Sequence, residues 1–304
     1  MQTVVGLGAV DTAVVQPILG PELQFIENPT EADIETAAGA IVRAAYKVDA
    51  TAFAAMPNLK VLARTGVGTE LVDLATAGER GIPVVITPGS NTNAVAEGAI
   101  AHALHLVKRL GPLTRLVADG SWNNRTQYPV GDFEGSTIGI VGFGRIGRRV
   151  AQLAAVFGMR VLAFDPFAEV PAASAVASLE DLVAQCDVVT LHVPLTDATH
   201  HLVNASLLAK FKPGAVLVNC GRGSLINLDD AHASLKNCHL GGVGLDVFDP
   251  EPPAHHAIFD HENVVLTPHV MGLSVASTKQ TFIDAAQGVR DVLEGRAPRA
   301  TASL

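Results

Sequence analysis

Residues 136–166 read STIGIVGFGRIGRRVAQLAAVFGMRVLAFDP. A short β-branched run leads into three glycines at the spacing GxGxxG, which are Gly142, Gly144 and Gly147. An amphipathic segment follows the glycines, and a second apolar run then ends at Asp165. This order predicts a strand, a tight turn, a helix and a second strand, as in the first half of a doubly wound α/β domain.

Each glycine has a separate physical role in this pattern. Gly142 permits the tight turn, Gly144 lets the backbone approach a pyrophosphate, and Gly147 lets the helix lie close to the sheet. The helix N-terminus offers unpaired N–H groups and a partial positive charge to phosphates. Asp165 is placed to accept hydrogen bonds from both ribose hydroxyls. The stretch predicts a bound dinucleotide, with NAD favoured over NADP because the acid would repel a 2′-phosphate.

Composition restricts the class of protein further. The 304 residues suffice for two domains, and 48 % of them are hydrophobic and can fill two cores. The formal net charge of −9 argues against a nucleic-acid surface. Three cysteines without CxxC spacing indicate neither a disulfide framework nor a metal site, which is typical of a reduced, cytoplasmic protein. We expect no signal peptide and no membrane anchor, because every apolar run is broken early.

Short apolar runs alternate with helical patterns on both sides of this stretch. The runs that read as strands lie at residues 3–5, 23–26, 40–42, 60–63, 84–86, 187–190, 215–219, 242–246 and 264–266. A long helix is expected at 91–110, with Gly111 and Pro112 as stop signals, and a polar loop at 120–131. We predict an α/β fold of two doubly wound parallel-sheet domains. A Rossmann domain, 93–274, is inserted into a smaller flavodoxin-like domain, 1–92 and 275–304.

Three polar residues follow predicted strands in the second domain. They are Arg222 in CGRGS, Glu251 in DVFDPEPP and His269 in LTPHV. Ligands of open α/β sheets lie beyond the carboxyl ends of the strands. Histidine suits proton transfer, a carboxylate partner favours its charged form, and arginine offers paired donors to a carboxylate. Around a nicotinamide, these groups are the ones that interconversion of a 2-oxo and a 2-hydroxy acid requires.

The chain resembles the D-isomer-specific 2-hydroxyacid dehydrogenase family over essentially its full length. The matching stretches are, in order, GIVGFGRIGRRVA, VLAFDP, LHVPLT, LVNCGRGSLI, GLDVFDPEPP and NVVLTPHV. The resemblance implies an NAD-dependent oxidoreductase that acts on a D-2-hydroxy acid. In it, Arg222 anchors the substrate carboxylate, His269 is the acid/base, and Glu251 is its carboxylate partner.

The same resemblance assigns further residues. Those expected at the cofactor are Gly142, Gly144, Arg145, Ile146, Gly147, Asp165, Pro194, Cys220 and Asp246, the last at the nicotinamide amide. The backbone of Thr65, Gly66, Val67 and Gly68 is expected to hold the substrate carboxylate in the cleft between the domains. A homodimer built on the second domain is also implied, with the helix at 91–110 and the loop around Trp122 as contacts.

The branch that the chain resembles most is D-3-phosphoglycerate dehydrogenase, in a short form without the C-terminal regulatory domain. The stretches at 39–48 and 62–73 carry this likeness, and Arg43 and Arg64 within them are candidates for a phosphate or second carboxylate. Alternatively, Arg43 and Arg64 are surface arginines at strand ends without a role in binding. Glu70 departs from the branch pattern. The candidate substrates are therefore 3-phosphoglycerate, hydroxypyruvate and glyoxylate.

Two other functions stay open. One is a formate or phosphite dehydrogenase of the same fold, although formate dehydrogenases place a glutamine where Glu251 stands. The other is a non-catalytic, NAD-sensing binding protein like the corepressors that share this fold. Those proteins retain a similar arginine, glutamate and histidine, so the motif alone does not separate them from the enzymes.

Overall fold

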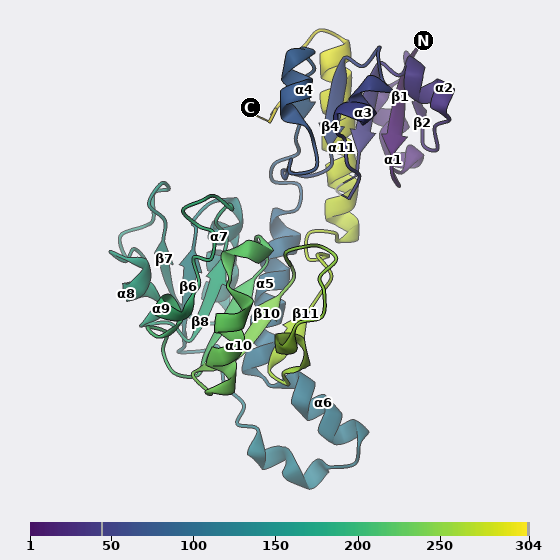
Figure 1. Cartoon of the computed structure of the whole chain (residues 1–304). Helices are drawn as coiled ribbons and strands as arrows, with labels where there is room; N and C mark the ends of the chain where they lie inside the picture. Colours follow the sequence, from purple (N-terminus) through teal and green to yellow (C-terminus); the bar gives the residue numbers. More distant parts are fainter. Residues whose placement is uncertain (44, 303–304) are drawn as a thin grey trace. The chain divides into compact units, whose positions relative to one another are not determined.

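The computed structural model describes residues 1–43 and 45–302. The chain divides into two compact units, a first unit of 1–91 with 273–304 and a second unit of 92–272. Each unit is built on its own parallel sheet (Figure 1). Among the described helices, none combines the length and apolar character that crossing a membrane requires.

The first unit contains a five-stranded sheet in the order β2-β1-β3-β4-β5. Its strands are β1 Gln2–Leu7, β2 Leu23–Ile26, β3 Gly39–Val42, β4 Val61–Arg64 and β5 Val84–Val85. Its helices are α1 Thr12–Leu19, α2 Glu31–Thr36, α3 Ala50–Ala54, α4 Leu74–Glu79 and α11 Val275–Leu293. This strand order is the flavodoxin-like order, so the predicted class of the smaller domain is confirmed.

Alternate residues of these strands fill two separate cores. Val4, Ile41 and Val61 pack against α1 and α11, while Val5 and Leu62 belong to the cluster on the opposite face, with α3 and α4. Successive side chains of a strand point to opposite faces, so one sheet supports a helical layer on each side. The last helix, α11, therefore completes the first unit although it lies at the far end of the sequence.

The second unit contains a six-stranded parallel sheet in the order β11-β10-β9-β8-β6-β7. Its strands are β6 Thr137–Val141, β7 Arg160–Phe164, β8 Val188–Leu191, β9 Ala215–Asn219, β10 Leu240–Leu245 and β11 Val264–Leu266. Its helices are α5 Thr92–Val107, α6 Leu110–Ala118, α7 Arg145–Val156, α8 Leu179–Val183, α9 Ala205–Leu208 and α10 Leu228–Lys236, with 3-10 turns η1 Trp122–Gln127, η2 Gly223–Leu225 and η3 Ala257–Asp260. The strand order reverses between β6 and β8, so the predicted doubly wound fold is confirmed.

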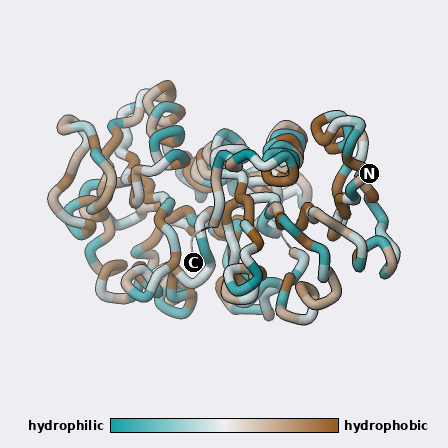
Figure 2. Tube along the Cα trace, turned by 90° about the horizontal axis from the view of Figure 1, so that it is seen from above, coloured by the Kyte–Doolittle hydropathy of each residue, from teal (hydrophilic) through white to brown (hydrophobic). Residues whose placement is uncertain are grey.

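Helices cover both faces of this second sheet. Residues of α5 and α7, such as Ala99 and Val150, pack with Ile138 and Ile140 on one face. Helices α8, α9 and α10 cover the other face through the cluster that contains Leu182 and Leu207. Along the Cα trace, short hydrophobic and hydrophilic stretches alternate (Figure 2).

Two local predictions were wrong or incomplete. Gly111 and Pro112 do not stop a helix but lie inside α6, and α5 ends at Val107 instead. The break falls at Arg109, whose φ of 54° is left-handed. Proline is tolerated in a first helical turn, where its missing N–H has no intrahelical partner anyway. The loop predicted at 120–131 contains η1.

Candidate active site

The glycine turn of the second unit has the geometry that a dinucleotide requires. Gly142 has a φ of 93°, and a Cβ at Gly147 would lie 2.1 Å from the carbonyl oxygen of Gly142. At Gly144, a Cβ would meet no described atom within 4 Å, and no described side chain caps the start of α7 there. The first N–H groups of α7 thus lack a capping side chain, the space beside Gly144 is open, and the residues present fit a pyrophosphate.

Asp165 follows β7 and closes this turn. Its Oδ2 accepts from the backbone N–H of Phe143 at 2.7 Å, and its Oδ1 accepts from Phe167 and Ala168. Burial opposes the charge, but these three donors outweigh it, so the pKa of Asp165 is lowered. The carboxylate is thus ionised and fixed beside the turn, as the ribose prediction requires. Arg145 and Ile146, in the first turn of α7, flank the same opening.

The three candidate catalytic residues follow three neighbouring strands. Arg222 comes after β9, Glu251 after β10 and His269 after β11, and β10 pairs with both other strands in parallel. Carboxyl ends of parallel strands meet at one edge of a sheet. The first two loops also touch: a Cβ at Gly223 would lie 2.1 Å from the carbonyl carbon of Phe248. The structure therefore gathers these loops at a single edge.

His269 and Glu251 lie in direct hydrogen-bond contact. The histidine Nδ1 lies 2.7 Å from Oε2 of Glu251, and Oε1 accepts from the backbone N–H of Phe248 at 2.9 Å. The carboxylate is thus fixed at both oxygens. His269 has a φ of 54°, in the left-handed region that costs a non-glycine residue about 1–3 kcal/mol. Its side chain is 52 % exposed, so the imidazole remains open to a ligand.

The other predicted residues of the second unit lie in the loops after β8 and β9. The guanidinium Nη1 of Arg222 donates to the carbonyl of Gly221 at 2.9 Å, which ties the side chain to its own loop. Burial, with repulsion from Asp246, raises the pKa of Cys220 to about 12, so its thiol stays protonated. Pro194 is exposed after β8, where its carbonyl accepts from Thr199. The cofactor contacts of these residues stay predictions.

Asp246 is buried, with an exposed fraction of 2 %, and its side chain is held by three donors. Oδ1 accepts from the Thr267 hydroxyl at 2.6 Å and from the Val270 N–H at 3.0 Å, and Oδ2 accepts from the Met271 N–H. The Thr267 hydroxyl also meets Nε2 of His102, on α5, at 3.1 Å. Sequence reasoning missed Thr267 and His102. A polar residue on the apolar face of an Ala-rich helix was the only available signal.

The predicted substrate residues of the first unit follow β3 and β4. Thr65 is buried and its hydroxyl donates to the carbonyl of Val42, while the N–H of Gly66 donates to the Thr87 hydroxyl. Val67 is exposed and Gly68 half-buried. The loop at 65–68 is thus anchored at its start and accessible at its tip, which fits a backbone site for a carboxylate.

Arg43 and Arg64 lie at the carboxyl ends of β3 and β4 in this unit. The guanidinium of Arg43 stacks over the ring of Phe282, 5.3 Å from its centroid. Arg64 is 6 % exposed, and its Nη1 donates to the Thr65 carbonyl at 3.2 Å. Arg43 is thus partly buried and Arg64 buried, and their role toward a substrate anion stays a prediction.

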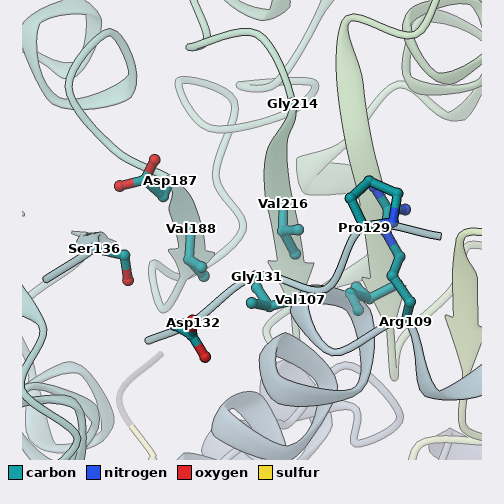
Figure 3. A pocket seen from close by; sticks show the side chains of 11 residues that line it. Val107, Arg109, Pro129, Gly131, Asp132, Ser136, Asp187, Val188, Gly214 and Val216 are labelled. Carbon is teal, nitrogen blue, oxygen red and sulfur yellow. The ribbon is translucent and has the colours of Figure 1, made fainter. Parts of the chain in front are cut away.

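A hollow of about 230 Å³ lies at the opposite edge of the second sheet (Figure 3). Its lining residues include Ser136, Asp187 and Gly214, which precede β6, β8 and β9. The acids there already have partners, because Asp187 pairs with Lys212 and Asp132 pairs with Lys108. The hollow therefore lies at the edge of the sheet opposite to the predicted site residues, and its acids are used in ion pairs.

The chain matches the family model described as "D-isomer specific 2-hydroxyacid dehydrogenase, NAD binding domain" over residues 100–271. It is 36 % identical over 291 residues to a D-3-phosphoglycerate dehydrogenase of Bacillus subtilis, covering 92 % of this chain and 54 % of that protein. The chain thus spans about half the length of the phosphoglycerate dehydrogenases that it matches.

A second relative matches over most of both proteins. A hydroxypyruvate reductase of Thermotoga maritima is 36 % identical over 244 residues, which are 79 % of each chain. Among solved structures, the TT0316 protein from Thermus thermophilus superposes with a TM-score of 0.88 at 34 % identity, covering 100 % of both chains. These similarities agree with the predicted family, fold and NAD cofactor.

Proposed function

We propose that this chain, which belongs to the D-isomer specific 2-hydroxyacid dehydrogenase family, interconverts a D-2-hydroxy acid and its 2-oxo acid with NAD as redox partner. The observation that carries the proposal is the hydrogen-bonded contact between His269 and Glu251. Their 2.7 Å contact lies at the carboxyl edge of the sheet that also carries the dinucleotide turn. A proton carrier and a cofactor site on one edge are what this reaction needs.

The second unit supplies the groups for the cofactor. The N–H groups at the start of α7 would bind the pyrophosphate, and the Asp165 carboxylate would accept the ribose hydroxyls. Asp246 has a second lone pair on Oδ2 beside the Met271 contact, which suits a carboxamide N–H. When bound, NAD accepts or supplies the hydride at the reacting carbon.

His269 would move the proton at the reacting oxygen. Nδ1 is held by Glu251, so Nε2 is the nitrogen that faces the substrate. In reduction, Nε2–H donates its proton to the carbonyl oxygen, and in oxidation Nε2 accepts the hydroxyl proton. Glu251 keeps the ring oriented and complements the positive charge of the imidazolium. This use of a proton at Nε2 favours a hydroxy acid over formate, which has no hydroxyl proton to transfer.

The substrate anion would be held by arginine and backbone donors. Arg222, tied to Gly221, offers its planar guanidinium to the carboxylate and carbonyl oxygen. The exposed tip of the loop at 65–68 is the second carboxylate site of the proposal. Arg43 and Arg64 would bind a phosphate if the substrate is 3-phosphoglycerate. With hydroxypyruvate or glyoxylate as substrate, their role is structural.

A homodimer and a cytoplasmic location complete the proposal. Helix α6 and η1 project from the second sheet as an arm (Figure 1). The large hydrophobic side chains exposed on residues 110–130 are Leu110, Val117, Trp122 and Val130. Exposed apolar patches on such an arm suit a contact with a second copy. The free thiols of Cys186, Cys220 and Cys238 suit a reducing compartment.

Steady-state kinetics of the purified chain test the activity. NADH oxidation is measured against glyoxylate, hydroxypyruvate, 2-oxoglutarate and pyruvate, and NAD reduction against D-3-phosphoglycerate, with NADPH as a parallel cofactor. We expect turnover of at least one 2-oxo acid with NADH. NADH binding without turnover of any of these acids would contradict the enzyme and favour a sensing protein.

Two matched arginine variants separate the candidate substrates. Arg43→Gln removes a charge that lies at the carboxyl end of β3, and Arg299→Gln removes the same charge from an exposed site of the same unit. A rise in KM for phosphoglycerate in Arg43→Gln alone would identify a phosphate site. Equal kinetics of both variants on every substrate would make Arg43 structural.

A further inference from the structure

The segment that presents His269 is anchored to one buried carboxylate. Asp246 accepts from the Thr267 hydroxyl and from the backbone N–H groups of Val270 and Met271. Its own carbonyl accepts from the backbone N–H of His269 at 2.8 Å. Residues on both sides of the histidine, and the histidine backbone itself, thus share Asp246 as their anchor.

His102 extends this anchor to α5. Its Nε2 lies 3.1 Å from the Thr267 hydroxyl oxygen. A hydroxyl has one proton, and Thr267 donates it to Asp246, so His102 must donate Nε2–H to the hydroxyl oxygen. His102 therefore carries a proton on Nε2, and in the neutral ring its Nδ1 is an acceptor. Consistently, Nδ1 is buried and has no hydrogen-bond partner among the described atoms.

The packing of α5 on the sheet leaves room for this histidine. A Cβ at Gly244, on β10, would lie 3.0 Å from Cβ and Nδ1 of His102. Any larger residue at Gly244 would displace the imidazole. Burial lowers the pKa of His102 more than the neighbouring Asp246 raises it, so the ring stays neutral and keeps its role as a single donor.

We propose that His102, Thr267 and Asp246 form a buried hydrogen-bond relay that positions His269. The relay runs from α5 through the Thr267 hydroxyl to the Asp246 carboxylate, which holds the 269–271 backbone. It keeps His269 in its left-handed conformation, the conformation in which Nδ1 meets Glu251. The relay is a positioning device, because His102 and Thr267 act only through Asp246 and the 269–271 backbone. As a contribution to catalysis it rests on the proposed function.

Two readouts test the relay, and the first needs neither substrate nor cofactor. Hydrogen exchange of the Val270 and Met271 amides is followed by NMR in Thr267→Val, which removes the hydroxyl at nearly constant volume. We expect their protection to fall at least about tenfold, because Asp246 loses a donor and shifts. Thr267→Ser restores the hydroxyl and is expected to restore protection. Unchanged exchange in Thr267→Val would overturn the relay.

The second readout is kcat for reduction of the best 2-oxo acid. Misplacement of a catalytic group by a distant change costs up to about 100-fold, so we expect kcat to fall roughly 10- to 100-fold in Thr267→Val and to recover in Thr267→Ser. His102→Phe is also expected to lower kcat. The matched control is His105→Phe, three residues along α5, which is expected to lose less. Equal losses in His102→Phe and His105→Phe would contradict the relay.

The experiments distinguish failure of the proposed dehydrogenase activity from failure of the proposed relay. If no 2-oxo acid is turned over, the exchange pattern still reports the relay in the protein without ligand. If the wild type is active but Thr267→Ser loses as much kcat as Thr267→Val, the hydroxyl is not the cause and the relay is wrong. Unfolding midpoints of all variants identify any general loss of stability.

Discussion

The two units begin with the same structural device and use it differently. In the first unit, β1 leads through Gly6 and Gly8 to α1, and in the second, β6 leads through Gly142 and Gly144 to α7. At the spacing where Gly147 completes the second turn, the first turn has Asp11. The Asp11 carboxylate accepts from the N–H of Ala13 and caps α1.

The difference shows what makes a turn of this kind a phosphate site. An acid already occupies the positive end of α1 and would repel a second anion. The positive end of α7 has a glycine at its N-cap, with open space where a side chain would lie. Strand order and topology alone therefore do not make a helix N-terminus a phosphate site. In the proposed function, the availability of the first N–H groups of the helix decides which unit binds the dinucleotide.

The largest effect is expected when α7 receives a capping side chain of its own. Gly144 has a φ of −74°, which any residue adopts, so Gly144→Asp is expected to fold with equal or slightly higher stability. The new carboxylate would occupy the phosphate position, and we expect NADH affinity to fall about 100-fold or more. Fluorescence titration with NADH measures it. Gly144→Ala adds bulk without charge and is expected to lose less affinity; an unaffected Gly144→Asp would show that α7 does not bind phosphate.

A second prediction concerns His192, against whose backbone Gly142 packs, and the pH dependence of stability. A Cβ at Gly142 would lie 2.7 Å from the backbone carbonyl of His192, and burial lowers the pKa of that histidine to about 4. The unfolded chain protonates His192 below its usual pKa of ~6.5, whereas the folded chain resists until about pH 4. Stability from this group is thus present above pH 6.5 and is lost as the pH falls.

Protonation of His192 lowers the free energy of unfolding by at most about 2 kcal/mol at pH 5 relative to pH 7.5. Urea unfolding at the two pH values measures it. We expect His192→Gln to lose less stability on acidification than the wild type, while His200→Gln, at an exposed histidine, behaves like the wild type. The same pH dependence in His192→Gln and the wild type would exclude His192 as a source.

The smallest effect is expected in the first turn. Asp11→Ala removes the cap of α1, which costs about 1 kcal/mol of stability. NADH affinity and stoichiometry should not change, because the proposed cofactor residues all lie in the second unit. Chemical unfolding and an NADH titration of the same sample measure both quantities. A change in NADH affinity would show that the capped turn takes part in cofactor binding.

Much of the fold was predictable because its signals are local. The GxGxxG spacing, the apolar runs and the acid at Asp165 depend on neighbouring residues, and the structure places the turn, α7 and β7 as predicted. Helix α6 was missed because Pro112 was interpreted as a stop, whereas the left-handed Arg109 ends α5. Such a break depends on packing and has no local signature.

The site was predictable in part for the same reason. Glu251 and His269 lie in recognisable motifs, and the structure brings them to 2.7 Å. His102 and Thr267 were missed because they are 165 residues apart in sequence and meet only after α5 packs on β10. A contact of this kind comes from tertiary structure, and one sequence contains no record of it.

The most direct test of the account is His269→Ala, assayed for turnover and for NADH affinity together. His255→Ala is the matched control, because His255 also pairs with an acid, Asp260, at 3.2 Å on the surface of the same unit. We predict that kcat falls about 10²- to 10⁴-fold in His269→Ala while NADH affinity stays near that of the wild type and His255→Ala keeps full activity. Unchanged turnover in His269→Ala would contradict the assignment of His269 as the acid/base.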